Sequence, residues 1–296
     1  MKKTMLSTKQ SYLVCFIGIL AAFGIVMALC ESGLADSYIK GIMMTACIAI
    51  IMTTSLNLTI GVLGQLTLGC CGFEAIGAYV AALTSKYMVA AGIAIDPTAR
   101  FLLTTLIGGV VACVFGILIG IPALRLHGDY LAIITLGFGE IIRVILTNID
   151  SVIGTDFTYG AAGLKRIPKY SSFTLVFICV VVCCYIIHTV MKSRHGRAIL
   201  SIREDEIASE SVGVQTTYYK TFAFVLSAMM AGIAGCLYAG YLGSLYPSTF
   251  KFMKSIEILV MVVLGGMGSM LGSILSATVL TILPELLRSF SDYRMV

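Results

Sequence analysis

Residues 41–73 read GIMMTACIAIIMTTSLNLTIGVLGQLTLGCCGF and contain no charged side chain. A straight α-helix of these 33 residues would be about 50 Å long, whereas the hydrocarbon core of a bilayer is about 30 Å thick. The stretch therefore has to turn or break. Glycine weakens a helix, and glycines are spaced through the second half of the stretch, so we expect the break between Gly61 and Gly72.

Further apolar runs predict that the chain crosses a membrane several times. Five uncharged runs are long enough for a transmembrane helix of about 20 residues, namely Tyr12–Cys30, Phe101–Leu124, Tyr170–Met191, Thr221–Phe250 and Ile258–Pro284. Two weaker spans carry charges, 73–95 with Glu74 and Lys86, and 130–149 with Glu140 and Arg143. The sequence predicts an all-α polytopic membrane protein of about eight transmembrane helices (about 7–10), at least one of them broken or re-entrant.

Glycines also interrupt the last of these runs. Gly265, Gly266 and Gly268 lie near the middle of Ile258–Pro284. Three glycines in four residues weaken a helix and permit a break where the backbone lines a cavity. A second break is therefore expected at residues 265–269.

The composition excludes several classes of protein. Only 12% of residues are charged, against about 25% in soluble domains, and the mean hydropathy is +0.99. These values argue against a soluble fold and against disorder. The net charge of +5 is small and not clustered, so no nucleic-acid partner is expected. The ten cysteines lie in or beside apolar runs without metal-ligand spacing, so we expect no metal site.

The distribution of lysine and arginine predicts the orientation. Placing the amino terminus inside puts more positive residues on the inner side than on the outer side, where Lys251 and Lys254 then lie. Residues 1–11 are then a cytoplasmic amino terminus, and 289–296 form a carboxyl-terminal tail. The run Tyr12–Cys30 is longer than the apolar part of a signal peptide, which favours an uncleaved first helix.

No residues with the pattern of a catalytic site are found. The sequence has no P-loop and no H-E-x-x-H, and its three histidines are isolated. We therefore expect no catalytic residue and no cofactor bound by this chain. Glu140 and Arg143 are three apart on one helix face and are predicted to form a structural ion pair. Glu74 has no partner in its own span and either faces a polar pathway or lies near the interface.

Residues 192–220 form the longest polar loop, which we call the polar segment. It holds nine charged residues, and glycines lie near both ends of a helix-compatible sequence. Projected as one helix, its apolar side chains do not form a single stripe, which disfavours an ordinary interfacial helix. The segment is either a docking element for a soluble partner or a solvated connector.

Four ordered blocks of the sequence resemble a known family. The first is the polar segment, with Gly196-Arg197-Ala198, Ser201 to Ala208, Gly213-Val214 and Lys220 to Ala228. The others are Ser55 to Tyr79, Leu124 to Arg143, and Ala231 to Ala239 with Leu264 to Ser269. Together they are similar to branched-chain amino acid ABC transporter permeases of the LivM type. The likeness covers residues 41 to 288 and departs from the family at Cys70 and Glu74, which leaves the substrate preference open.

The resemblance implies a permease domain over residues 12–288 in the cytoplasmic (inner) membrane of a bacterium. It implies a second related permease subunit, two ABC ATPase subunits that bind the ATP, and an extracytoplasmic binding protein that delivers leucine, isoleucine or valine. The residues implied in coupling to the ATPases are Gly196, Arg197, Ile202, Arg203, Glu204, Asp205, Glu206, Ala208 and Gly213. The candidates for polar groups along the translocation pathway, next to the expected first break, are Asn57, Gln65, Thr67 and Glu74.

Other functions are left open. A related permease for another small amino acid, an amide or a sugar fits the same blocks. A self-contained secondary transporter is supported by the two expected breaks, which lie in different halves of the chain. A membrane enzyme is disfavoured because no acid, base, metal set or nucleophile is brought together by the pattern.

Overall fold

A computed structural model describes residues 37–92, 96–126, 128–154 and 158–286. The predicted first span Tyr12–Cys30, the amino-terminal segment 1–11 and the tail 289–296 lie outside these residues. Contacts divide the chain into two units, Met1–Met44 and Thr45–Val296. The described part of the first unit, 37–44, is the start of helix α2.

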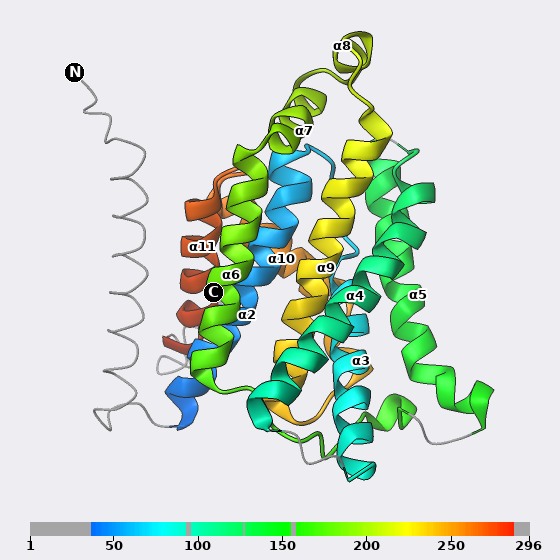
Figure 1. Cartoon of the computed structure of the whole chain (residues 1–296), viewed down its shortest axis with the longest axis vertical. Coiled ribbons are helices and arrows are strands. Elements are labelled where there is room, and N and C mark those ends of the chain that lie inside the picture. The colour runs from blue at the N-terminus through cyan, green and yellow to red at the C-terminus, as the bar shows by residue number, and fades with distance from the viewer. Residues whose placement is uncertain (1–36, 93–95, 127, 155–157, 287–296) are drawn as a thin grey trace. The chain divides into compact units, whose positions relative to one another are not determined.

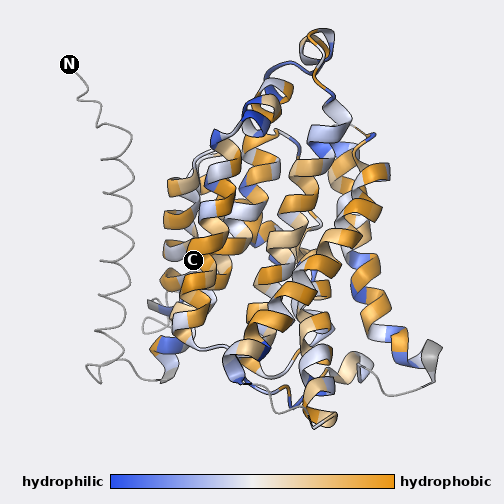
Figure 2. Ribbon diagram, in the orientation of Figure 1, coloured by the Kyte–Doolittle hydropathy of each residue, from blue (hydrophilic) through white to orange (hydrophobic). Residues whose placement is uncertain are grey.

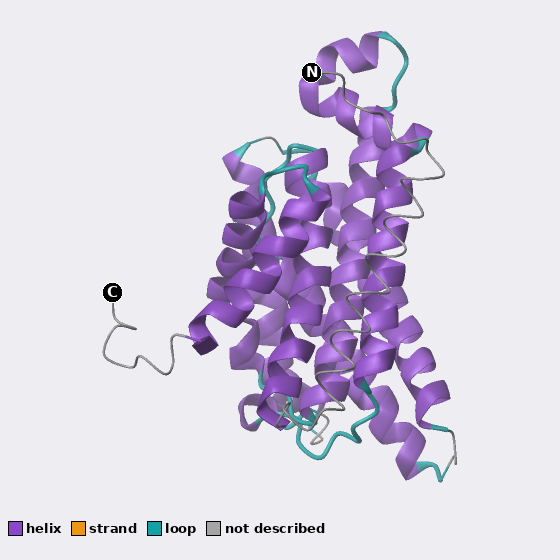
Figure 3. Ribbon diagram, turned by 90° about the vertical axis from the view of Figure 1, so that its left-hand side faces the viewer, coloured by secondary structure: helices purple, strands orange, loops and turns teal. Residues whose placement is uncertain are grey.

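The described residues form helices joined by turns and loops (Figures 1 and 3). The long helices are α2 (Ser37–Asn57), α3 (Cys70–Ala90), α4 (Pro97–Ala123), α5 (Asp129–Ile153), α6 (Phe173–Lys192) and α9 (Thr216–Leu242). The shorter ones are α7 (Arg194–Glu204), α8 (Glu206–Ser211), α10 (Phe252–Gly265) and α11 (Met270–Leu286). A π-helical turn, η1 (Leu58–Val62), extends α2, and η2 (Gly160–Ala162) and η3 (Pro247–Phe250) are 3-10 turns.

The prediction of an all-α polytopic membrane protein is confirmed. Five described helices are long and apolar enough to cross a membrane, namely Tyr38–Val62, Pro97–Ala123, Asp129–Ser151, Phe173–Lys192 and Thr216–Leu242. Figure 2 shows apolar residues along these helices and polar residues gathered around α7. The weaker span predicted over 73–95 forms α3, which begins at Cys70.

The first expected break lies where the glycines predicted it. After α2 the helix continues as the wider π-helical turn η1. The residues that follow bond back to this turn: Leu63 N donates to Leu58 O at 3.1 Å, and Gln65 N donates to Thr59 O at 3.0 Å. Gly64 then adopts a φ of 77°, which glycine tolerates at little cost. Residues 64–69 are not helical, and α3 starts at Cys70. The uncharged run 41–73 is therefore one spanning helix followed by a turn back into the bundle.

The prediction of one span over Ile258–Pro284 is wrong, although its break was expected. Gly266 and Gly268 have φ values of 87° and 84°, so the chain reverses there and α11 returns along α10. The two helices are antiparallel, since Ser276 Oγ donates to Met261 O at 2.5 Å and Gly265 lies against Gly272. The glycines make a helical hairpin instead of a kink because Gly266 ends α10 with a positive φ and Gly268 takes another positive φ in the turn that follows.

Helix α9 is central to the core and packs mainly against α3 and α4. It is shorter than the predicted run Thr221–Phe250, because it ends at Leu242 before Gly243, whose φ is 74°. Small residues bring its backbone close to α3. A Cβ at Gly77 would lie 2.0 Å from the carbonyl oxygen of Gly232, so only glycine permits this spacing.

Candidate functional site

The polar segment folds into two short helices, α7 and α8, at one end of the bundle (Figure 1). Ser193 Oγ caps α7 by accepting a hydrogen bond from Gly196 N at 3.3 Å, and Asp205 Oδ1 caps α8 by accepting from Ala208 N at 3.0 Å. Asp205 between the helices is extended, with φ −155° and ψ 114°. This break shifts the helical phase, which is why a projection of the whole segment as one helix shows no apolar stripe.

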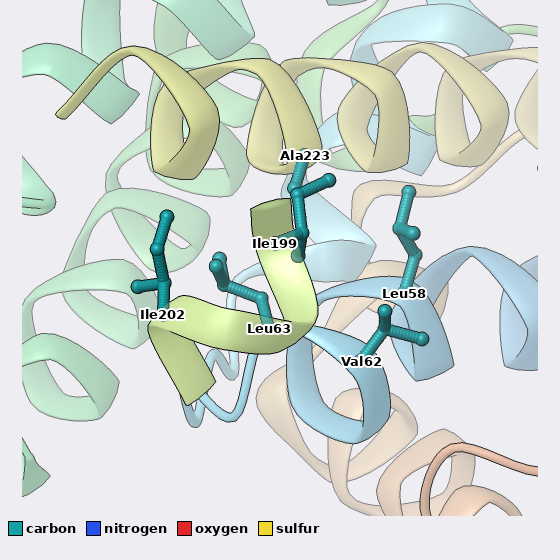
Figure 4. Close-up of a cluster of buried hydrophobic side chains, with 6 residues drawn as sticks. All are labelled: Leu58, Val62, Leu63, Ile199, Ile202 and Ala223. Carbon is teal, nitrogen blue, oxygen red and sulfur yellow. The ribbon is translucent and has the colours of Figure 1, made fainter. Parts of the chain in front are cut away.

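One face of α7 is buried in the bundle. Gly196, Ile199 and Ile202 are its buried residues and are spaced three apart. Ile199 and Ile202 belong to a core cluster that contacts the end of α2 and helix α9 (Figure 4), together with Leu58, Val62, Leu63 and Ala223. Gly196 and Ile202, which the resemblance placed in contact with a partner, therefore face the interior of this chain.

Arg203 is also directed toward the bundle. Although the residue is exposed, its Nη1 donates a hydrogen bond to the carbonyl oxygen of Gly61 at 2.5 Å. Gly61 lies in η1, 142 positions earlier in the chain. The charged end of Arg203 is thus bound at the first helix break.

Helix α8 is attached to the start of α9 by polar contacts. Lys220 Nζ lies 2.5 Å from Glu206 Oε1, and the Lys220 side chain is only 3% exposed. Thr216 Oγ1 donates to Glu210 Oε1 at 2.6 Å. Glu206 is therefore paired within the chain, and these contacts hold α8 in a defined position.

The remaining residues implied in coupling lie on the surface. They are Arg197, Glu204, Asp205, Ala208 and Gly213. Beside them, Ile207 and Val212 are 82% and 79% exposed. Sequence reasoning missed these two residues, although apolar side chains within a run of charges were a signal that could have found them. A surface of mixed charge with two projecting apolar groups is suited to contact with a protein.

The four candidate pathway residues do not share one cavity. Asn57 is 2% exposed, and its Oδ1 accepts from Gly268 N at 2.8 Å. Gln65 is half-buried in the loop between η1 and α3. Thr67 lines a small pocket whose walls are mainly apolar and include Leu56, Phe73, Phe224 and Ala231.

Glu74, the fourth candidate, is paired inside the bundle. Its Oε1 lies 2.6 Å from Lys254 Nζ, and the side chains are 0% and 24% exposed, respectively. Lys254 Nζ also lies 4.6 Å from the ring centroid of Tyr238 and 5.1 Å from that of Phe250. Lys254 lies on α10, which begins at Phe252, and this helix carries the lysine against α3.

The predicted ion pair of α5 is present. Arg143 Nε donates to Glu140 Oε2 at 2.7 Å. The second oxygen, Glu140 Oε1, accepts from Phe252 N at 3.1 Å, at the first residue of α10. A carboxylate is favourable at a helix amino terminus, so this pair also positions α10.

Among the described residues, no group of three His, Cys, Asp or Glu side chains could hold a metal ion.

Comparison with known proteins gives the family. The chain is 38% identical over 283 residues to the high-affinity branched-chain amino acid transport system permease protein LivM of Salmonella typhimurium and to LivM of Escherichia coli. Each alignment covers 84% of this chain and 63% of the relative, so the chain spans less than two thirds of their length. It is also 32% identical over 106 residues to the permease protein LivH of Escherichia coli, covering 35% of this chain and 34% of LivH.

No solved structure gives a significant match. Residues 38–295 match the family described as the branched-chain amino acid transport system permease component. This match includes both helix breaks, the polar segment and all the transmembrane helices described above. The chain therefore belongs to the family of branched-chain amino acid transport system permease components.

Proposed function

We propose that this chain is the permease subunit of an ABC importer that moves leucine, isoleucine or valine across the cytoplasmic membrane of a bacterium. Family membership and the similarity to LivM support the substrate class. The observation that carries the mechanism is the two-sided polar segment, which is packed on the bundle by Ile199 and Ile202 and projects Ile207 and Val212 outward. Such a segment can transmit force because it is attached on one side and free to bind on the other.

The outward side of the polar segment is the proposed contact for a separate ATPase subunit. Burying an exposed isoleucine or valine side chain contributes about 1.5–3 kcal/mol. Ile207 and Val212 are therefore the expected apolar anchors, and Arg197, Glu204 and Asp205 surround them with charge that selects the partner. ATP is bound and hydrolysed on two such ATPase subunits, and this chain holds no cofactor.

The other proposed partners follow from the same assignment. LivM and LivH are both named as permease proteins of a high-affinity branched-chain amino acid transport system, and this chain resembles each. We infer that it pairs with a second, LivH-like permease. An extracytoplasmic binding protein delivers the substrate at the end of the bundle opposite the polar segment.

The docking surface is tested by the double variant Ile207→Ser/Val212→Ser. A tagged chain is purified from native membranes, and the ATPase recovered with it is measured beside uptake of labelled leucine into vesicles. The double variant is expected to lose at least about tenfold of the recovered ATPase, since about 1.4 kcal/mol already corresponds to a factor of ten.

Tyr87→Ser is the matched control for ATPase recovery, since Tyr87 is 76% exposed near the end of α3, away from α7 and α8 (Figure 1). Full recovery of the ATPase with the double variant would contradict the docking assignment. Leucine uptake driven by an ion gradient without any ATPase would instead favour the secondary transporter. Competition by other amino acids, amides or sugars distinguishes the related substrates.

A further inference from the structure

Arg203 contacts the first helix break along its whole side chain. Its guanidinium binds the Gly61 carbonyl at 2.5 Å, and its stem lies against Gly64. A Cβ at Gly64 would be 2.8 Å from Arg203 Cγ. The side chain therefore occupies the space that these two glycines leave open, instead of extending from the surface toward a partner.

The turn between α10 and α11 meets the same point. Gly268 N donates to Asn57 Oδ1 at 2.8 Å, and a Cβ at Gly61 would lie 2.2 Å from Gly268 N. A Cβ at Gly268 would lie 3.4 Å from Arg203 Nη1. Residues from three distant parts of the chain thus converge at one place, which we call the break junction: Asn57, Gly61, Arg203 and Gly268.

The chemistry of the break junction favours an arginine. Because η1 ends at Val62, the carbonyl groups of its last turn have no continuing helix to bond to. The carboxyl end of a helix carries partial negative charge and attracts a cation. Hydrogen bonds from a charged donor are stronger than those from a neutral one. The bond from Arg203 to Gly61 is therefore a firm link between α7 and the end of α2.

A rigid element connects the break junction to the interior of the bundle. Helix α10 is 14 residues long and ends two residues before the turn position Met267. Its other end carries Lys254, which is paired with Glu74 of α3. A displacement of Gly268 therefore moves a helix whose far end holds a buried ion pair, and packed helices shift as bodies between discrete arrangements.

We propose that Arg203 is a positioning residue that couples movement of the polar segment to both helix breaks, and that it is not a contact of the ATPase. The inference rests on the proposed function. When a docked ATPase displaces α7, Arg203 moves the Gly61 carbonyl, and Gly268 follows because it is bonded to Asn57 one turn earlier. The ends of α2 and α10 then move together.

Adjacency alone does not establish coupling, so the test measures coupling itself. The complete transporter, with its permease, ATPase and binding-protein partners, is reconstituted in proteoliposomes. ATP hydrolysis and uptake of labelled leucine are measured in the same vesicles for wild type, Arg203→Ala, Arg203→Lys and Arg194→Ala. Arg194 is the matched control because it is an exposed arginine at the start of the same helix.

Arg203→Ala is expected to retain the ATPase, while uptake per ATP hydrolysed falls about tenfold, within the range of typical coupling free energies. Arg203→Lys is expected to recover part of this ratio, because its ammonium supplies one charged donor to Gly61, and Arg194→Ala is expected to leave the ratio unchanged. Loss of the ATPase from Arg203→Ala would overturn the proposal by making Arg203 a docking contact. An unchanged ratio would overturn it as well.

Asn57→Ala provides a second test if Arg203→Ala does not accumulate in membranes. It removes the acceptor of Gly268 N from the other side of the break junction. The ratio of uptake to hydrolysis is expected to fall here too, and a wild-type ratio would contradict the proposal. A wild-type transporter that takes up no leucine would count against the proposed function, whereas a working transporter with an unchanged ratio in the variants would count against this inference alone.

Discussion

Glu74 and Lys254 are 180 positions apart in the sequence, yet their charged atoms lie 2.6 Å apart within the helix bundle. The pair joins the amino-terminal part of α3, in which Glu74 is the fifth residue, to that of α10, in which Lys254 is the third. The ion pair therefore helps to fix where each of them starts inside the bundle.

The two halves of this pair should respond differently to substitution. Lys254→Met leaves the wholly buried Glu74 carboxylate without its counter-ion, and removing one partner of a buried pair costs about 3–5 kcal/mol. Glu74→Gln should cost less, because the Lys254 side chain is 24% exposed and can extend its ammonium toward water. Thermal unfolding in detergent measures both.

The exposed acid Glu257 on α10 supplies a matched control for this pair, and Glu257→Gln should leave the unfolding temperature nearly unchanged. The double variant Glu74→Gln/Lys254→Met is expected to be more stable than Lys254→Met alone, since it removes both charges. A Glu74→Gln variant less stable than Lys254→Met would contradict the asymmetry derived from their exposure.

Gly61 should not tolerate a side chain. A Cβ there would lie 2.0 Å from Asn57 Oδ1 and 2.2 Å from Gly268 N. These two atoms are hydrogen-bonded to each other, so neither can move away without losing that bond. Gly61→Ala is expected to cost at least about 1–3 kcal/mol as overpacking. Gly137 in α5 has no atom within 4 Å of its Cβ position, so Gly137→Ala should be neutral or stabilising by up to about 1 kcal/mol. Equal unfolding temperatures for the two variants would show that α2 and the hairpin turn are not in close contact.

Ile202 should behave as a core residue and not as a docking residue. It is 5% exposed and packs in the cluster with Leu58, Val62 and Ile199. Ile202→Ala is expected to lower the free energy of unfolding by about 2–5 kcal/mol. Leu200 on the same helix is 39% exposed, and Leu200→Ala should have a much smaller effect. Loss of ATPase binding by Ile202→Ala at unchanged stability would show instead that Ile202 contacts the ATPase.

The contact between Lys220 and Glu206 should control the mobility of α8. Lys220 is 3% exposed, so Glu206→Ala leaves a buried ammonium without its carboxylate. The expected penalty is about 1–3 kcal/mol, as for other buried groups that lose a hydrogen-bond partner. Limited proteolysis should cut the polar segment faster in Glu206→Ala than in wild type. Glu204→Ala is the control, because Glu204 is exposed, and a cleavage rate equal to that of Glu206→Ala would argue against the anchoring role.

Much of the architecture could be predicted from local patterns. The uncharged runs predicted the membrane class, because lipid excludes charge and sets the length of a spanning helix. Glycine spacing predicted both breaks, and the spacing of Glu140 and Arg143 predicted their ion pair. The polar segment was also located from its charges, but its division into two helices at Asp205 was not predicted. That break depends on where α8 is capped and attached, through Ala208 and Lys220.

The sequence by itself determined the membrane class, the family and the positions at which helices are interrupted, since these depend on the composition of neighbouring residues. Only the tertiary structure decided what the interruptions do: that the run 258–284 folds back on itself, that Glu74 is paired with Lys254, and that Arg203 turns inward to Gly61. The last two contacts join residues 180 and 142 positions apart, respectively. Their partners are chosen by how close the helices can approach and by the need to satisfy buried charges and freed carbonyl groups, and no local pattern encodes either.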